Sequence, residues 1–369
     1  MAVTIHDVAR AAGVSPGTAS RALRGHPQVS AACIARVRAA AIQIGYKALR
    51  DRSGRARPEP LAGRRIGIAV IGTDRTAASV PCVAEAVAGA EAALLQAGAE
   101  PLLVRAFNPA EPPKLLRRIK LDGVLAQVSL RAGVMAAVGS RVEPFFRDTP
   151  LVWMLGRPAG AAGDAVDADD QRAGELAARA VLDQGHRHVA IVNPSIDHLL
   201  HAVRSRAFRE AIESAGGRVE EFPPPPDRTP SSAQEVKDVA QVQPLVDEAT
   251  TALRRRKARG PAAGPTLLFC PADGVASLVY QALAARGLSA GRDISVVTCT
   301  HDRGPVADLR PSLAAVDIHP KRVGMMAVSQ LGRRIRGDFA GAAVRIGIAP
   351  TFVSGGSLER CRADRRASR

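Results

Sequence analysis

Short apolar runs alternate with amphipathic segments along most of the chain, from residue 65 onward. The runs have the length of buried parallel strands, and they lie at 66–72, 101–107, 123–130, 150–156, 188–194, 266–273 and 294–300. Between them, apolar residues recur with helical spacing at 82–97, 171–184, 202–215 and 275–286. This alternation predicts doubly wound α/β layers in two subdomains. A ligand cleft is expected where the carboxyl ends of their strands face each other.

The first 48 residues follow a different pattern, which predicts three short helices. Apolar side chains at 5, 8, 9 and 12 share one helical face, and Gly13 suits the left-handed residue that ends a helix. Ser15 and Pro16 have the order of an N-cap followed by proline at the first helical position. A third helix is predicted over 30–44. Residues 1–48 therefore form an all-α helix-turn-helix domain.

A helix-turn-helix places the N-terminal residues of its second helix against base edges in the major groove. Here these residues are Pro16, Gly17, Thr18 and Arg21, and the guanidinium of Arg21 can bond guanine O6 and N7 together. Short polar side chains and helix N-caps suit phosphate oxygens, which adds to the predicted DNA-binding set Thr4, Ser15, Ser20 and Ser30. The alternative is that these residues are ordinary caps on a small helical bundle.

The distribution of charge favours DNA binding over that alternative. The chain has 51 Lys and Arg against 35 Asp and Glu, a net charge of +16. Residues 1–65 hold twelve basic and only three acidic side chains, so the rest of the chain is nearly balanced. A basic head on a balanced body is typical of a nucleic-acid-binding module.

The sequence of the head resembles the DNA-binding domain of the LacI family of bacterial transcription regulators. The resemblance rests on TIHDVARAAGVSPGTASRALRGHPQVS, followed by IGY at 44–46. The body is similar to the periplasmic-binding-protein-like effector domain of the same family through IGIAVIG, LDGVLA, DADDQRAGELAARAVLDQGHRHVAIV, RSRAFREAIESAG and the segment 269–297. Membership implies a homodimeric regulator, a repressor, that binds a palindromic operator and a small effector such as a sugar or related metabolite. A tetramer is left open.

The resemblance also implies a domain plan, in which the chain crosses between the two subdomains near 165–170, 300–305 and 337–346. The effector-binding and dimerisation domain then spans 65–369. Its N-subdomain comprises about 65–167 and 302–337, and its C-subdomain about 168–301 and 344–360.

Residues 49–64 are predicted to be a linker or hinge, because they are rich in Arg, Pro and Gly. In the family such a segment folds as a hinge helix that inserts a leucine into the minor groove. The usual Pro-Asn after Gly-Tyr is absent here, and neither Leu49 nor Leu61 stands in a convincing register. A solvated basic linker is an equal alternative.

Two charged residues are implied as effector ligands. Arg204 occupies the arginine of an R-x-x-G-F pattern, with Ala207 in place of the glycine, and Asp273 matches an aspartate that bonds sugar hydroxyls. The alternative is that both residues pair with each other or with surface charges. Weaker candidates for effector contacts are Asp74, Trp153 and Thr300, although a tryptophan is more often a core residue.

Two departures from the family pattern put the class of effector in question. Thr300 replaces the aspartate that follows the strand at 294–299, and Gly355 stands where an arginine is expected near the C-terminus.

Other chemistries lack their motifs, so neither an enzyme nor a cofactor is predicted. The sequence contains no GxxxxGK[ST] phosphate loop and no GxGxxG at a strand-to-helix turn. The pairs His186 with His188 and His198 with His201 have no third metal ligand in view, so no metal site is expected. The carboxylates at 167, 169 and 170 are interpreted as caps of the next helix rather than as a catalytic pair.

The cysteines and the absence of targeting segments indicate a protein of the cytoplasm. Five cysteines without CxxC spacing fit reduced thiols, and no apolar run approaches the ~18–20 residues of a membrane span. The first residues lack the order of a secretory signal. A second class is kept as an alternative: a cytoplasmic solute-binding protein or sugar-processing enzyme with an incidental basic head.

Overall fold

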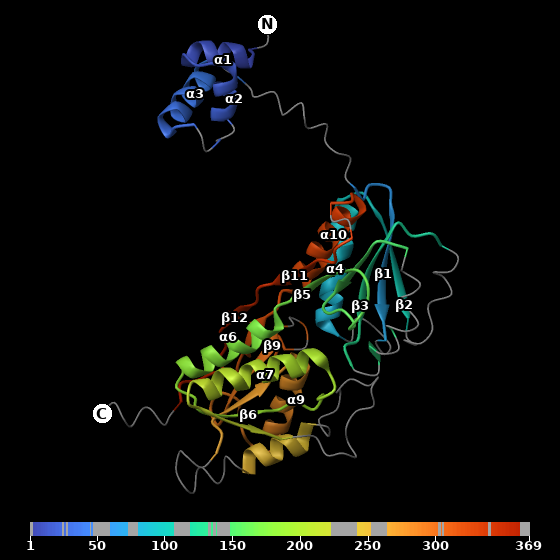
Figure 1. Cartoon of the computed structure of the whole chain (residues 1–369). Coiled ribbons are helices and arrows are strands. Elements are labelled where there is room, and N and C mark those ends of the chain that lie inside the picture. The colour runs from blue at the N-terminus through green and yellow to red at the C-terminus, as the bar shows by residue number, and fades with distance from the viewer. Residues whose placement is uncertain are drawn as a thin grey trace. The chain divides into compact units, whose positions relative to one another are not determined.

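The computed structural model divides the chain into two units, Met1–Pro58 and Glu59–Arg369, here called the head and the body (Figure 1). The structure describes residues 3–23, 26, 29–44, 46, 60–72, 80–106, 119–131, 134–135, 138, 148–222, 242–251, 264–301, 304, 306–338 and 341–361. The first part of the linker predicted at 49–64, residues 49–59, lies outside these described residues.

Three helices form the head: α1 (Ile5–Ala12), α2 (Pro16–Leu23) and α3 (Ala31–Gln43). Gly13 ends α1 in the left-handed conformation with φ 64°, and α2 begins at Pro16, as the sequence predicts. The apolar faces of the helices meet in one small core, which includes Val8, Ala19 and Val37. The all-α head is thereby confirmed.

The first sheet of the body has the strand order β11-β5-β4-β3-β1-β2, and all of these pairings are parallel. Its strands are β1 (Arg65–Ile71), β2 (Glu100–Ala106), β3 (Gly123–Val128), β4 (Leu151–Met154), β5 (Asp164–Ala168) and β11 (Arg345–Ile348). Helices α4 (Pro81–Gln96) and α10 (Pro320–Ile335) cover one face of this sheet.

The second sheet has the order β12-β10-β9-β8-β6-β7, parallel except that β12 runs antiparallel to β10. Its strands are β6 (His188–Ile191), β7 (Arg218–Glu221), β8 (Leu267–Cys270), β9 (Ser295–Thr300), β10 (Ala314–Asp317) and β12 (Thr351–Val353). Helices α6 (Asp170–Asp183) and α7 (Leu199–Ser214) cover one face, while α9 (Asp273–Ala284) and a helical run at 242–251 cover the other. The predicted pair of doubly wound α/β subdomains is therefore confirmed.

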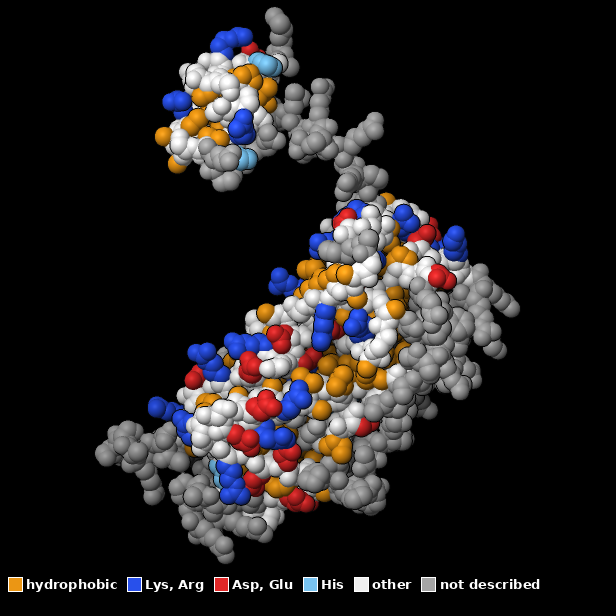
Figure 2. All heavy atoms as spheres, viewed as in Figure 1, with side chains coloured by type: hydrophobic (Ala, Val, Ile, Leu, Met, Phe, Trp, Pro, Cys, Tyr) orange, Lys and Arg blue, Asp and Glu red, His pale blue; other side chains and the backbone are white. Residues whose placement is uncertain are grey.

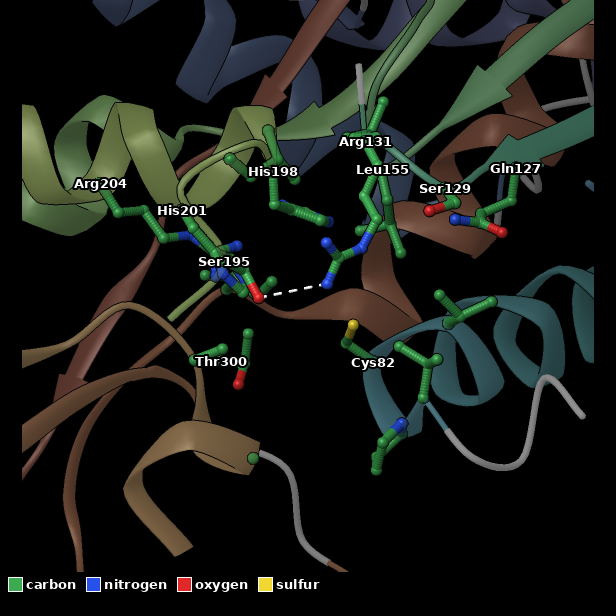
Figure 3. Close-up of a pocket in the computed structure, with 18 of the residues that line it drawn as sticks. Cys82, Gln127, Ser129, Arg131, Leu155, Ser195, His198, His201, Arg204 and Thr300 are labelled. Carbon is green, nitrogen blue, oxygen red and sulfur yellow. Dashed lines mark hydrogen bonds between the residues drawn. The ribbon is translucent and has the colours of Figure 1, made fainter. Parts of the chain in front are cut away.

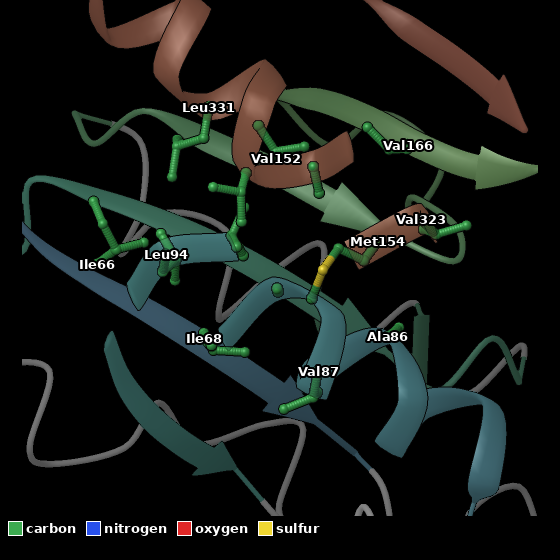
Figure 4. Close-up of a cluster of buried hydrophobic side chains, with 14 of the residues drawn as sticks. Ile66, Ile68, Ala86, Val87, Leu94, Val152, Met154, Val166, Val323 and Leu331 are labelled. Atoms are coloured by element: carbon green, nitrogen blue, oxygen red, sulfur yellow. The ribbon is translucent and has the colours of Figure 1, made fainter. Parts of the chain in front are cut away.

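Alternate residues of β1 enter separate cores on the two faces of its sheet, which explains why this strand is apolar from Ile66 to Ile71. In β1, Ile66 and Ile68 face α4 and α10, whereas Ala69 faces the other way (Figure 4). The two helices also touch at glycines, because a Cβ at Gly324 would overlap the carbonyl oxygen of Ala86. This close approach holds α10, a late segment of the chain, in the first subdomain.

The chain crosses between the sheets at 168–170, 317–320 and 348–351. Only the first crossing agrees with the domain plan from sequence; the second and third occur later in the chain than 300–305 and 337–346. Strand β10 pairs with β9 in the second sheet, and β11 pairs with β5 in the first. Both strands are four residues long, so their pairing partners, rather than a local pattern, decide where the crossings fall.

The body also begins earlier than the sequence indicates. Leu61, one of the two leucines considered for the hinge, is buried in the core beneath α10 and lies beside Gly332. It belongs to the packed body and is not available as a wedge for DNA.

Five strands were missed in the sequence because each is short and several are polar: β5, β7, β10, β11 and β12. In β5, the fully buried carboxylate of Asp164 accepts hydrogen bonds from Gln330, Arg334 and the backbone N–H of Val344. Long-range partners of this kind leave no periodic signal in the sequence.

Across the described residues, no helix is long and apolar enough to cross a bilayer.

Candidate functional site

A cavity of about 210 Å³ lies where the carboxyl ends of the strands of both sheets approach each other (Figure 3). In each sheet the strand order reverses at this place, between β1 and β3 and between β6 and β8. Ligands of doubly wound folds bind at such switch points because the connecting loops diverge there. The cavity is lined by residues within 80–83, 127–131, 195–204 and 272–275, together with Leu155, Thr300 and Ile318.

Arg204 lines this cavity from α7, but its guanidinium is already engaged. Its Nε and Nη2 lie 2.7 and 2.6 Å from Oδ1 of Asp170, and Nη1 donates to the carbonyl of Pro271 at 2.9 Å. Burial tends to lower the pKa of Arg204, and the carboxylate of Asp170 raises it above its ordinary value, so the guanidinium stays charged. Arg204 therefore forms an ion pair, and its partner is Asp170 rather than Asp273.

Asp273 opens α9 and is fully buried, without contributing to the lining of the cavity. Its backbone N–H donates to Oγ1 of Thr300 at 3.3 Å. Thr300 does line the cavity, and its backbone has a φ of 109°, a strained value for a residue with a branched side chain. The hydrogen bond between Asp273 and Thr300 holds the start of α9 against the end of β9.

Of the two remaining effector candidates, the structure describes only Trp153, which does not line the cavity. Trp153 is fully buried in the core on the far face of the first sheet, where its indole N–H donates to the carbonyl of Ala162 at 2.7 Å. The interpretation of Trp153 as a ligand contact is corrected by this burial. Asp74 lies outside the described residues.

Sequence reasoning missed a polar link that crosses the cavity. Arg131 follows β3 and is buried, and its Nη1 lies 2.7 Å from Oδ1 of Asp197 in the second subdomain. Its Nη2 donates to the hydroxyl of Ser195 at 3.2 Å. Applying the switch-point rule to the segments after β3 and β6 would have singled out these residues.

Two histidines of α7 and of the segment before it also face the cavity. The rings of His198 and His201 lie 4.2 Å apart between centroids, and both Nδ1 atoms are buried without a hydrogen-bond partner among the described residues. Burial, with the charges of Arg204 and Arg131, lowers the pKa of His198 to about 3. The same effects, with His198, hold the pKa of His201 well below its ordinary value, so both imidazoles are neutral at pH 7.

In the head, α2 buries Ala19 and Ala22 and exposes the opposite face. Pro16, Gly17 and Arg21 lie on that exposed face, and a guanidinium nitrogen of Arg21 would be 3.7 Å from a Cβ at Gly17. The arginine thus extends back along α2 toward its N-terminus, where base contacts are expected. Figure 2 shows that charged side chains on the visible face of the head are mostly basic.

Three of the other predicted DNA-binding residues, Thr4, Ser15 and Ser30, act as helix caps within the head. The hydroxyl of Ser15 accepts from the N–H of Thr18 at 3.1 Å, and that of Ser30 accepts from Cys33 at 3.3 Å. Thr4 donates from its backbone and its hydroxyl to Asp7, which lowers the pKa of that carboxyl. Caps and DNA contacts are compatible because helix N-termini attract phosphate. Ser20 is half-buried within α2.

Comparison with protein families connects the two units. Residues 4–48 match the model of bacterial regulatory proteins, lacI family, and residues 178–358 match that of a periplasmic binding protein-like domain. This chain belongs to the LacI family. Its members are transcriptional regulators, so the protein is a DNA-binding regulator controlled by an effector and not an enzyme.

Relatives of this LacI-family regulator match along nearly all of its length. The transcriptional regulator GntR of Pseudomonas aeruginosa is 27% identical over 355 residues, covering 90% of each chain. The ribose operon repressor of Escherichia coli is 26% identical over 339 residues, covering 90% of this chain and 93% of its own. Both head and body therefore share one ancestry with these regulators.

Solved structures share the fold at lower identity. The complex of the regulator CelR with cellobiose has a TM-score of 0.62 and 21% identity, covering 96% of this chain and 99% of that one. The Lac repressor dimer bound to operator and an anti-inducer has a TM-score of 0.57 and 18% identity, covering 97% and 100%.

The glycine found where an arginine was expected near the C-terminus, Gly355, has a structural role. A Cβ at Gly355 would overlap the backbone of Leu313 and Ala314, so no side chain fits at this position. The segment after β12 makes a close contact there with the start of β10. Within the described residues, no group of three His, Cys, Asp or Glu side chains is arranged to hold a metal ion.

Proposed function

We propose that this LacI-family regulator binds a palindromic operator as a homodimer and that a small effector in the body's cleft alters its affinity for DNA. The observation that carries the proposal is the exposed face of α2, on which Arg21 lies over Gly17 in a basic three-helix head. The proposed DNA contacts are Pro16, Gly17, Thr18 and Arg21 at the bases, with Thr4, Ser15, Ser20 and Ser30 near phosphates.

The proposed domain plan keeps the head predicted from the sequence and starts the body where the structure shows it to be packed. Residues 1–48 are the DNA-binding head, and residues 49–59 join it to the body. A dimer is needed because two heads must reach half-sites about one helical turn apart. The operator-bound dimer of the Lac repressor, which shares the fold, supports this assembly. Because operator DNA must be reached, the proposed compartment is the cytoplasm.

The effector is proposed to bind in the cavity between the subdomains, near Arg204, Asp273 and Thr300, with Asp74 as a further candidate. Related structures that hold cellobiose or ribose support a small metabolite in this place. The effector acts only through a difference in affinity between two arrangements of the subdomains.

Operator binding can be tested by selecting sites from random DNA and measuring affinity over a salt series. We expect a palindromic consensus and an affinity that falls steeply with salt, because Lys and Arg displace counterions from phosphates. A consensus without two-fold symmetry, or an affinity insensitive to salt, would refute the proposal. Sedimentation of the protein with and without operator distinguishes a dimer from a tetramer.

Arg21→Lys tests the proposed base contact directly, since it keeps the charge and removes the forked guanidinium. We expect a loss of about 10–100-fold in operator affinity, with relaxed preference at one base pair of each half-site. Arg10→Lys is the matched control, because Arg10 is an exposed arginine of α1 that pairs with Asp7. An operator affinity of Arg21→Lys equal to that of Arg10→Lys would mean that Arg21 contributes charge alone.

A further inference from the structure

The cavity between the subdomains has an unusual set of ionisable side chains. Among the described residues that line it, these are two arginines, two histidines and Cys82, and no aspartate or glutamate. The nearby carboxylates of Asp170 and Asp273 are buried behind the lining. The described lining therefore carries fixed positive charge, and its hydrogen-bond acceptors are uncharged side chains such as Gln127, Ser129 and Thr300.

Arg131 retains hydrogen-bonding capacity toward this space. A guanidinium has five N–H donors, and Asp197 and Ser195 together occupy two of those of Arg131. Figure 3 shows Arg131, His198 and His201 directed toward a common region of the cavity. The Nδ1 atoms of His198 and His201 are both buried, and the described residues offer neither of them a hydrogen-bond partner.

The electrostatic field at the imidazoles is positive. The charged groups that act on His198 are Arg204 and Arg131, and both oppose protonation of its ring. Asp197 and Asp170 hold the guanidinium groups in place but do not cancel their effect at the rings. A ligand anion placed here would be attracted by two fixed charges whose side chains are largely buried.

Most of the cavity lining in the first subdomain is apolar. The start of α4 contributes Val80, Pro81 and Val83, and Val128, Leu130 and Leu155 add to it, while Gln127 and Ser129 lie beside them. The apolar wall that these side chains form offers few hydrogen bonds to a ligand that carries hydroxyl groups on every side. The cavity is also smaller than the ~300–1,000 Å³ of sites for drug-sized molecules, so it suits a compact ligand.

We propose that the effector is a compact organic acid, whose carboxylate lies between Arg131 and the imidazoles of His198 and His201 and whose apolar body lies against the start of α4 and the end of β3. This inference rests on the proposal that the cleft is the effector site. The carboxylate accepts hydrogen bonds from the guanidinium and from imidazole N–H groups, and the apolar wall disfavours a neutral sugar.

Calorimetric titration of the full-length protein tests the inference with matched pairs of acid and amide. Benzoate is compared with benzamide, hexanoate with hexanamide, and both with ribose and cellobiose. We expect an acid to bind at least tenfold more tightly than its amide, and to raise the melting temperature accordingly. Tighter binding of a sugar, equal binding of acid and amide, or no binding of any acid would overturn the inference.

Variants separate the proposed contacts from general damage to the fold. Arg131→Gln and the double variant His198→Gln, His201→Gln should each weaken the acid by tenfold or more. Arg206→Ala should leave it unchanged, because Arg206 is an exposed arginine on α7. If Arg131→Gln unfolds, the histidine variant decides, and unchanged acid binding in it overturns the inference.

Operator binding by the ligand-free protein distinguishes the two proposals. If the ligand-free protein selects a palindromic operator and no acid binds, only the ligand inference fails. If an acid binds and no operator can be selected, the inference stands and the proposed function fails.

Discussion

Replacing Arg204 with methionine should lower the free energy of unfolding of the body, even when no ligand is present. Its guanidinium makes two contacts with Asp170 and one with the carbonyl of Pro271, and it is 2% exposed. The change leaves the carboxylate of Asp170 buried between α6 and α7 without its counter-charge. Breaking a buried ion pair in this way costs about 3–5 kcal/mol.

The loss should be largely recovered when both partners are replaced. Replacing a buried pair by apolar side chains of similar volume is often neutral. The double variant Arg204→Met, Asp170→Leu should therefore recover at least half of the lost stability. Arg206→Ala is the control, since Arg206 is 61% exposed on the same helix and its removal should change stability by less than about 0.5 kcal/mol.

Urea unfolding provides the assay, followed by circular dichroism and by the fluorescence of Trp153, the only tryptophan. A free energy of unfolding for Arg204→Met within about 1 kcal/mol of the unchanged protein would refute the reasoning. Arg204 would then be free to act as a ligand group, as the sequence suggests. If the large loss is found, a missing effector response in a single Arg204 variant reports instability rather than a lost contact.

Three further outcomes are expected. Lowering the pH from 7 to 5 should destabilise the native state by about 2 kcal/mol for each of His198 and His201, because their lowered pKa values keep them neutral while the unfolded imidazoles take up protons below pH ~6.5. Stability is lost from pH 6.5 toward 3, and calorimetry of the double glutamine variant should give a flatter profile. Gly324→Ala should cost about 1–3 kcal/mol in urea unfolding, since its Cβ would overlap the carbonyl oxygen of Ala86; an unchanged midpoint would mean that α10 can shift. Ser15→Ala should destabilise α2 by about 1 kcal/mol through loss of its cap, seen as earlier melting of the helical signal of the head, and equal melting would contradict that role.

Most of the regular structure could be predicted from local patterns. The seven predicted strands appear as β1, β2, β3, β4, β6, β8 and β9. Each is a short apolar run, and all of them are largely buried except the edge strand β2, whose Leu103 is 47% exposed. The caps at Ser15 and Ser30 and the left-handed Gly13 follow from local chemistry that needs no tertiary partner. Strand β5 could not be found in this way, because the partners that bury Asp164 lie far away in the chain.

The location of the candidate ligand site could be predicted from the sequence, but the full set of residues that line it could not. The switch-point rule and the family resemblance both lead to the segments after the strands, and Arg204 and Thr300 do line the cavity. The resemblance did not indicate Arg131, since its role depends on Asp197 in the other subdomain. The burial of Trp153 in the first sheet likewise depends on packing that a single residue in a sequence does not reveal.

The basic helix-turn-helix head and the doubly wound α/β body follow from the amino-acid order, because helix caps, hydrophobic periodicity and charge distribution are local properties. The crossings between the subdomains, and the charges that meet at the cleft, depend on how the folded elements pack. Short strands and buried ion pairs gain their stability from partners distant in the chain. Arg204 is the clearest case: its identity could be recognised in the sequence, while its engagement with Asp170 came from the packing of α7 against α6.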